Sequence, residues 1–132
     1  MVDVVGTTTF AWFAIFVALN TLLLLVLGLN ISRLRISQKI PYGDGDYRPM
    51  MQAIRAHGNG VEHTTIYGMA ILAMTLMQVD SGWVATMVLT FTGARMLHAY
   101  GMLYKAFTAR RIGAGITFLL QGISVVVLFS VV

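Results

Sequence analysis

The chain has 132 residues, of which 58% are hydrophobic and only 11% are charged, and its formal net charge is +4. A soluble domain usually carries about 25% charged residues, so this composition excludes an ordinary soluble protein and indicates one integral membrane domain over residues 1–132. The absence of cysteine excludes disulfides, thiolate metal sites and a cysteine nucleophile. The basic residues lie in short segments without interleaved aromatic runs, which argues against nucleic acid as a partner.

The first expected helix follows a short polar tail at residues 1–9. It contains 22 uncharged residues in a row, from Phe10 to Ile31. On a helix this stretch is about 33 Å long, which is enough to cross a bilayer core of about 30 Å. The sequence therefore predicts a membrane-spanning helix over about residues 8–37, followed by a loop of turn-forming residues at 41–46.

The remaining sequence predicts three more helices, at about residues 49–79, 82–107 and 110–131. Pro49 is acceptable in the first turn of the second helix. Asp80 or Ser81 is expected to cap the third helix, and residues 108–111 to form the short connection to the fourth. A chain of this length supplies four spans and little else, because each span needs about 20 residues. The expected fold class is thus an all-α membrane protein with a four-helix transmembrane bundle.

The lysines and arginines predict an orientation. The second loop holds no basic residue. The first and third loops and their flanks hold seven: Arg33, Arg35, Lys39, Arg48, Lys105, Arg110 and Arg111. Loops one and three share a side in a four-span bundle, so the positive-inside rule puts both in the cytoplasm. Both termini are then expected outside the cytoplasm.

A polar stripe opens the second helix. Arg55, Asn59 and Glu62 are spaced at i, i+4 and i+7, so they share one face of a helix. A cation, an amide and a carboxylate are costly to place in or beside lipid. They could form a structural ion pair that locks helix packing, or a pocket for a zwitterionic or anionic ligand. In a pocket, arginine suits carboxylates and glutamate suits an ammonium group.

The third helix carries a second polar pair, Arg95 and His98, at i and i+3. Small residues such as Gly93 beside them permit a close approach of another helix. The pair is expected in the same membrane layer as the stripe on the second helix. His57 and His63 do not predict a metal site, because six residues place them about 240° apart around a helix.

Two further sets of side chains could contribute to a ligand site. Arg110 and Arg111 are explained by the positive-inside rule, but one of them could reach a pocket mouth, where an arginine favours the thiolate form of a thiol. Tyr67, Tyr100 and Tyr104 could hydrogen-bond a ligand, although packing and interfacial positions are commoner for tyrosine in membrane proteins.

These motifs resemble those of a known family. The segment Arg55-Ala56-His57-x-Asn59-x-x-Glu62 is similar to the first motif of the MAPEG family, the membrane-associated proteins of eicosanoid and glutathione metabolism. The segment Gly93-x-Arg95-x-x-His98 resembles the second motif, and the Arg33-Leu34-Arg35 exit of the first span is also similar. The resemblance covers nearly the whole chain, and it is greatest to short bacterial members without cysteine. It thus implies a protein of the bacterial inner (plasma) membrane.

The resemblance implies a homotrimer of four-helix subunits that binds glutathione between neighbouring subunits, near the cytoplasmic face. The implied function is a glutathione-dependent transferase or peroxidase that acts on lipophilic electrophiles arriving from the membrane lipid. Arg55, Asn59 and Glu62 would hold the glutathione backbone, and Arg33 would contribute from an adjacent subunit. The pocket wall would contain Arg95 and His98. Arg110 or Arg111 would stand where the family places its thiol-activating arginine.

Two departures from the family pattern leave alternatives open. Met102 occupies a position where many members have a tyrosine, and Gly58 stands where some members have a basic residue. One alternative is therefore a non-catalytic membrane protein that binds lipid or glutathione. The other is a purely structural four-helix membrane protein.

Overall fold

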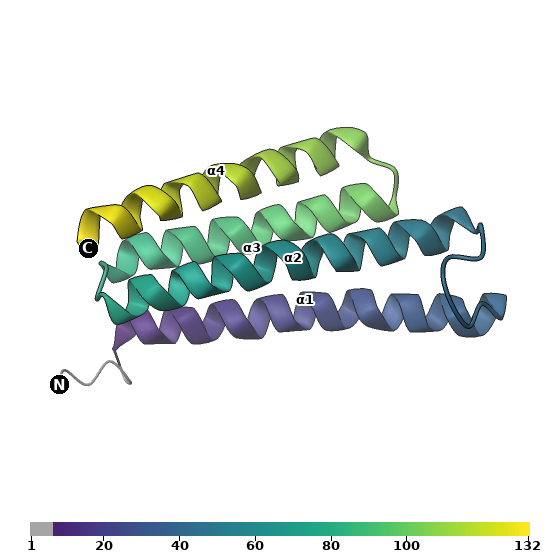
Figure 1. The fold of residues 1–132 in the computed structure, drawn as a ribbon, viewed down its shortest axis with the longest axis horizontal. Coiled ribbons are helices and arrows are strands. Elements are labelled where there is room, and N and C mark those ends of the chain that lie inside the picture. Colours follow the sequence, from purple (N-terminus) through teal and green to yellow (C-terminus); the bar gives the residue numbers. More distant parts are fainter. Residues whose placement is uncertain (1–6) are drawn as a thin grey trace.

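The computed structural model describes residues 7–132, so the first part of the predicted polar tail lies outside the described residues. Four helices follow one another as antiparallel neighbours along the chain (Figure 1). They are α1 Thr8–Gln38, α2 Arg48–Leu76, α3 Ser81–Leu103 and α4 Phe107–Val131. The predicted all-α four-helix bundle is confirmed.

α1 contacts the bundle along one narrow stripe. Its buried residues are Phe16, Asn20, Leu27 and Leu34. This spacing of four and seven residues follows one face of a helix. The leucines around this stripe are exposed, and Leu22, Leu25 and Leu29 each keep more than half of their surface uncovered. α1 and α4 are both long and apolar enough to cross a membrane. The uncovered apolar surface is what a helix in contact with hydrocarbon requires.

α3 is the central helix of the bundle. It packs against α1, α2 and α4, whereas α1 and α4 do not contact each other. Its buried residues consequently lie on several faces, in contrast to the single stripe of α1. Arg95 and His98 are among them, with 2% and 6% of their surface exposed. The central place of α3 is what puts these two ionisable side chains inside the bundle.

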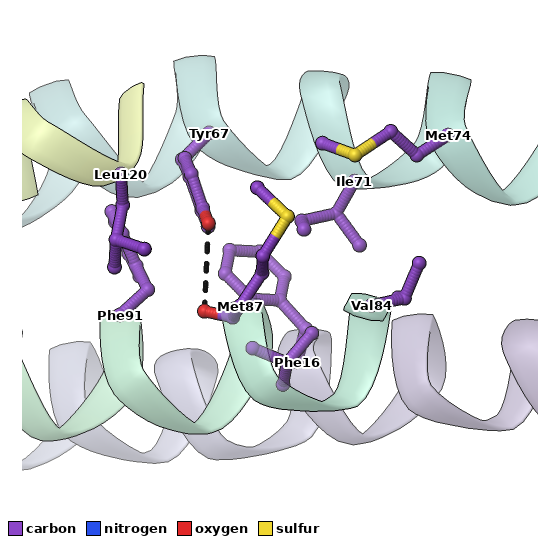
Figure 2. Close-up of a cluster of buried hydrophobic side chains, with 9 residues drawn as sticks. Phe16, Tyr67, Ile71, Met74, Val84, Met87, Phe91 and Leu120 are labelled. Carbon is purple, nitrogen blue, oxygen red and sulfur yellow. Dashed lines mark hydrogen bonds between the residues drawn. The ribbon is translucent and has the colours of Figure 1, made fainter. Parts of the chain in front are cut away.

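A compact apolar cluster fills the half of the bundle that lies toward the second loop. Figure 2 shows its side chains in close-up. At its centre the Tyr67 ring stacks on the Phe91 ring, with centroids 4.0 Å apart and an angle of 5° between the planes. Phe16 of α1 packs against both rings at a tilt. The Tyr67 hydroxyl donates a hydrogen bond to the Met87 carbonyl oxygen at 3.4 Å. Tyr67 is fully buried here, so it serves packing rather than ligand contact.

We expect Tyr67→Phe to lower the free energy of unfolding only slightly, by about 0.6 kcal/mol, the average for hydrogen bonds between membrane helices. The ring stack on Phe91 survives this change, and the hydrogen bond that is lost is long. Thermal unfolding in detergent micelles measures the effect. Tyr42→Phe is the control, because Tyr42 is 88% exposed in the first loop. A large loss of stability in Tyr67→Phe would contradict this view of the hydroxyl.

The helix ends follow local rules that the sequence carries. Asp80 caps α3, because its Oδ1 accepts hydrogen bonds from the backbone N–H groups of Gly82 and Trp83. Pro49 lies in the first turn of α2. Both features agree with the expectations from sequence. In the first loop the Arg35 guanidinium donates to the carbonyl oxygens of Ile40 and Gly43.

The third connection differs from the expectation. α3 ends at Leu103 rather than near residue 107, and residues 108–111 belong to the first turns of α4 rather than to a loop. The chain reverses over residues 104–106, where Lys105 has a left-handed backbone conformation with φ of 57°. This conformation ends a helix. The sequence has no glycine or proline at residues 104–106 from which this end could be predicted. As a result Arg110 and Arg111 are fixed on a helix.

The first and third loops lie at the same end of the bundle (Figure 1). We call this the basic end, because seven basic residues belong to these loops or flank them: Arg33, Arg35, Lys39, Arg48, Lys105, Arg110 and Arg111. Both described chain ends and the second loop lie at the opposite end. The apolar cluster occupies the half of the bundle away from the basic end, which leaves the other half for the polar side chains of α2 and α3.

Candidate functional site

A cavity of about 610 Å³ lies between α2, α3 and α4 in the half near the basic end. We call it the basic pocket. Six of the nine lysines and arginines of the chain line it: Arg48, Arg55, Arg95, Lys105, Arg110 and Arg111. No aspartate or glutamate of the described residues is part of its wall. Its volume lies within the range of about 300–1,000 Å³ that is usual for small-molecule sites. A pocket with this wall attracts an anion.

α2 contributes one helical stripe to the pocket wall. Arg48, Gln52, Arg55, Asn59 and His63 line the pocket, at spacings of three and four residues that keep them on one face. Glu62 is exposed and does not line the pocket. It lies about 60° around the helix from Asn59, on the flank of the stripe. The structure thus brings Arg55 and Asn59 together in one wall and leaves Glu62 at its edge.

Arg95 is the most enclosed polar group of the site. One Nη atom donates to Asn59 Oδ1 at 2.6 Å, and the other lies 3.5 Å from Thr117 Oγ1. His98 Nδ1 is 3.4 Å from the same guanidinium group. The Arg95 Nε–H is buried and has no partner among residues 7–132. The guanidinium group therefore links α2, α3 and α4 at one level and fixes the side chain of Asn59.

The cationic side chains of the basic pocket form no ion pair with a carboxylate of the described residues. Among residues 7–132 no arginine or lysine lies within 4.0 Å of an aspartate or glutamate oxygen. Arg55 and Glu62 in particular are not paired, although their spacing allowed it. All hydrogen-bond partners of Arg95 are uncharged, so no carboxylate of the described residues directly contacts its positive charge. The same residues hold no group of three or more histidines and carboxylates that could bind a metal ion.

Arg110 and Arg111 line the pocket from the first turn of α4. Both guanidinium groups lie over the Phe107 ring, 5.2 and 5.5 Å from its centroid. Arg110 also contacts the Met102 sulfur, at 3.9 Å. Met102, the residue at the family's tyrosine position, thus lies in the pocket wall beside an arginine. Tyr100 points elsewhere, since it is half exposed and does not line the pocket.

α3 and α4 approach so closely here that only glycine fits at two places. A side chain at Gly101 would collide with the backbone of Arg110. A Cβ atom at Gly113 would lie 2.6 Å from the Ala94 carbonyl oxygen and 2.7 Å from the His98 backbone nitrogen. The absence of a side chain at Gly113 therefore allows the backbone of α3 at His98 to lie directly against α4. Gly93, which the sequence suggested as the small contact residue, is exposed and has no neighbour within 4 Å of its Cβ position.

Arg33 is separate from the basic pocket within one chain. It lines a smaller cavity on the α1 side, together with Pro49 and Tyr104, and its guanidinium donates to Asn30 Oδ1 at 3.0 Å. His57 also faces away from the basic pocket, toward Gly28 of α1. Arg33 at the end of the first span and His57 of the first motif therefore belong to other surfaces of the subunit.

His63 is a pocket residue that the sequence reasoning missed. It lines the innermost part of the basic pocket, and its Nδ1 lies 3.2 Å from the Gln121 amide nitrogen. Its ring meets the edge of Phe118 at 5.3 Å between centroids. The signal was present in the spacing, since Arg55, Asn59 and His63 follow one another at four-residue intervals. It was overlooked because His63 was considered only as a metal ligand.

Comparison with known proteins identifies the family of the chain. The model of the MAPEG family matches residues 13–130. The inner membrane protein YecN of Escherichia coli strain K12 is 32% identical over 104 residues, which is 79% of either chain. The protein of the same name from Escherichia coli O6:H1 gives the same values. No solved structure matches significantly. With a family match that covers all four helices, we conclude that the chain belongs to the MAPEG family, as a membrane protein related to an inner membrane protein.

Proposed function

We propose that this protein is a glutathione-dependent transferase or peroxidase that acts on lipophilic electrophiles. The observation that carries the proposal is the basic pocket, in which six cationic side chains meet no carboxylate among the described residues. Glutathione in its thiolate form has two carboxylates, one thiolate and one ammonium group, so it is a net anion. Arginine binds carboxylates through two parallel hydrogen bonds. Membership of a family concerned with glutathione metabolism supports the same ligand.

The pocket suggests a role for each candidate residue. Arg55 and Asn59 would bind the peptide backbone and carboxylates of glutathione, with the Asn59 amide held in place by Arg95. His98 would complete the wall. Glu62, on the flank of the stripe, is proposed to bind the ammonium group. Orientation of the two reactants and stabilisation of charge by these groups would supply the rate enhancement.

Arg33 is proposed to contribute to the site from a second subunit, as the family resemblance implies. It lies outside the basic pocket of its own chain, so a contact with glutathione bound there would have to come from a neighbour. We propose a homotrimer in which Arg33 of one subunit extends the pocket of the next. By the positive-inside rule the basic end would face the cytoplasm, and both termini would lie on the other side of the inner membrane.

The assay that tests the proposal is conjugation of a chlorodinitroarene by the purified protein with glutathione, together with calorimetric titration of glutathione. We expect saturable binding and turnover above the rate in solution. A protein that neither binds glutathione nor forms the conjugate would overturn the proposal.

The two arginines of α4 offer a sharper test. We expect Arg111→Gln to lower the thiolate fraction of bound glutathione, and with it kcat, about tenfold at neutral pH, because a nearby cation favours the thiolate. Ultraviolet absorbance of the thiolate and the kcat for the arene measure the two effects. Arg110→Gln is the matched variant, and its effect should be smaller because the Arg110 guanidinium is already in contact with Met102. Equal thiolate signals in wild type and Arg111→Gln would exclude this role.

A non-catalytic glutathione-binding or lipid-binding protein is the second candidate. Met102 favours it, because a thioether in the pocket wall cannot donate a hydrogen bond to sulfur as a tyrosine hydroxyl can. Binding of glutathione without turnover in the assay above would select this candidate.

A further inference from the structure

The basic pocket is long, and its two ends differ in chemistry. Its wall on α2 runs from Arg48 to His63, about 22 Å along the helix. Toward the basic end the wall carries arginines and lysine. At the inner end, farthest from the first and third loops, the wall consists of His63, Ala114 and Phe118. The nearest cation there is Arg95. A ligand that fills the whole pocket therefore has a polar, anionic part and an apolar part.

The inner end is accessible from the outside of the bundle. Phe118 lines the pocket and is also 61% exposed, so its ring belongs both to the pocket wall and to the surface of α4. α4 is one of the two helices that are apolar enough to cross the membrane. The inner end of the pocket thus borders apolar surface of α4, which suits the hydrocarbon part of a lipophilic molecule.

His63 presents one unused hydrogen-bond donor at this inner end. The Gln121 amide nitrogen is a donor and lies 3.2 Å from His63 Nδ1, so Nδ1 accepts and the ring proton is on Nε2. Among residues 7–132 no acceptor contacts Nε2, yet Nε2 is not among the buried atoms without a partner. Nε2 is therefore not fully enclosed, and the residue that carries it lines the pocket. An N–H group without an acceptor is costly at bilayer depth, so this position favours a ligand that brings an acceptor.

We propose that the inner end of the basic pocket binds a carbonyl-bearing lipophile, whose oxygen accepts a hydrogen bond from His63 Nε2–H while its chain lies along Phe118. A carbonyl group fits because it accepts a hydrogen bond and adds no donor of its own. A carboxylate would instead be attracted to the cationic groups nearer the loops. The inference deepens the proposed function, because it names the polar group of the second substrate.

The first experiment needs no glutathione, so it can succeed or fail independently of the proposed function. The chain has three histidines, and ¹⁵N-histidine labelling in detergent micelles makes each imidazole visible by NMR. We expect 2-nonanone to shift the Nε2–H resonance of His63 and to leave that of His57, which faces α1, unchanged. Nonane at the same mole fraction should shift neither. His63→Gln assigns the resonance by removing it.

The outcome that overturns the inference is equally specific. If nonane and 2-nonanone shift the His63 resonance alike, or if neither shifts it, no hydrogen bond to a carbonyl forms there. If 1-nonanol shifts the resonance and 2-nonanone does not, the site selects a donor, and the tautomer argued above is wrong.

The second experiment connects the site to catalysis through inhibition of chlorodinitroarene conjugation. In the wild type 2-nonanone should inhibit about tenfold more strongly than nonane, as one hydrogen bond in a water-poor site provides. This ratio should fall to near unity in His63→Leu and recover in His63→Gln, which keeps a donor near the position of Nε2. A merely structural role of His63 would weaken both inhibitors equally. If the wild type shows no conjugation at all, the proposed function fails, and the NMR result alone decides this inference.

Discussion

Replacing Arg95 with methionine is expected to raise the Kd for glutathione about ten- to hundredfold while the bundle keeps its stability. The change removes a charged donor worth about 1.5–3 kcal/mol in a hydrogen bond, and about 1.4 kcal/mol corresponds to each tenfold in Kd. It also releases Asn59, whose Oδ1 now accepts from the guanidinium at 2.6 Å. Isothermal titration with glutathione in micelles measures the loss of affinity.

We expect the free energy of unfolding to stay nearly unchanged although the affinity falls, because the hydrogen-bond partners of Arg95 are uncharged. Removal of one member of a buried ion pair is strongly destabilising because it leaves an uncompensated buried charge, and removal of Arg95 leaves no such charge. Here Asn59 and Thr117 remain as uncharged groups, and Asn59 faces an open pocket. Thermal unfolding of Arg95→Met should therefore resemble that of the wild type.

Two further variants separate the binding role from a structural one. Arg95→Lys keeps the charge but lacks the planar fork that reaches both Asn59 and Thr117, so we expect an intermediate Kd. Arg35 lies outside the pocket, where it donates hydrogen bonds to the first loop. Arg35→Met should therefore leave the Kd for glutathione unchanged. A variant Arg95→Met that cannot assemble, together with a fully stable Arg95→Lys, would show instead that the charge is needed for the fold.

The helices and the polar stripe could be predicted from the sequence, because both depend on spacing along one helix. The uncharged stretch from Phe10 to Ile31 and the repeat of Arg55 and Asn59 are local patterns. Whether the stripe turns toward Glu62 or toward His63 depends on the rotation of α2 about its own axis. That rotation is set by packing against α3 and α4, and no single helix carries the information.

The third connection and the close contacts could not be predicted for a related reason. The left-handed conformation at Lys105 ends α3 at a residue that usually continues a helix. Gly93 and Gly113 have the same local chemistry, yet one is exposed and the other touches the backbone of α3. The difference arises from the register between α3 and α4. A single sequence does not show that register. Family resemblance predicts which side chains form the site, but not which contacts fix them.

Gly113→Ala is the second change for which we expect a large effect. The added methyl group would lie 2.6 Å from the Ala94 carbonyl oxygen and 2.7 Å from the His98 nitrogen. Both are backbone atoms of α3, so no side-chain rotation relieves the overlap and the two helices must separate. Overpacking of this kind costs about 1–3 kcal/mol. We expect a lower midpoint of thermal unfolding in micelles and a weaker affinity for glutathione, because His98 moves with the backbone that is displaced.

Gly115→Ala is the matched control on the same helix. Gly115 is exposed, and its Cβ position has no neighbour within 4 Å. Alanine should be tolerated there or should stabilise α4 slightly, since glycine is about 1 kcal/mol less favourable than alanine in a helix interior. Equal unfolding midpoints for the two variants would show that α3 and α4 do not pack as closely as described. If Gly113→Ala instead loses stability and affinity together while Gly115→Ala loses neither, the contact between α3 and α4 is what holds His98 in the pocket wall.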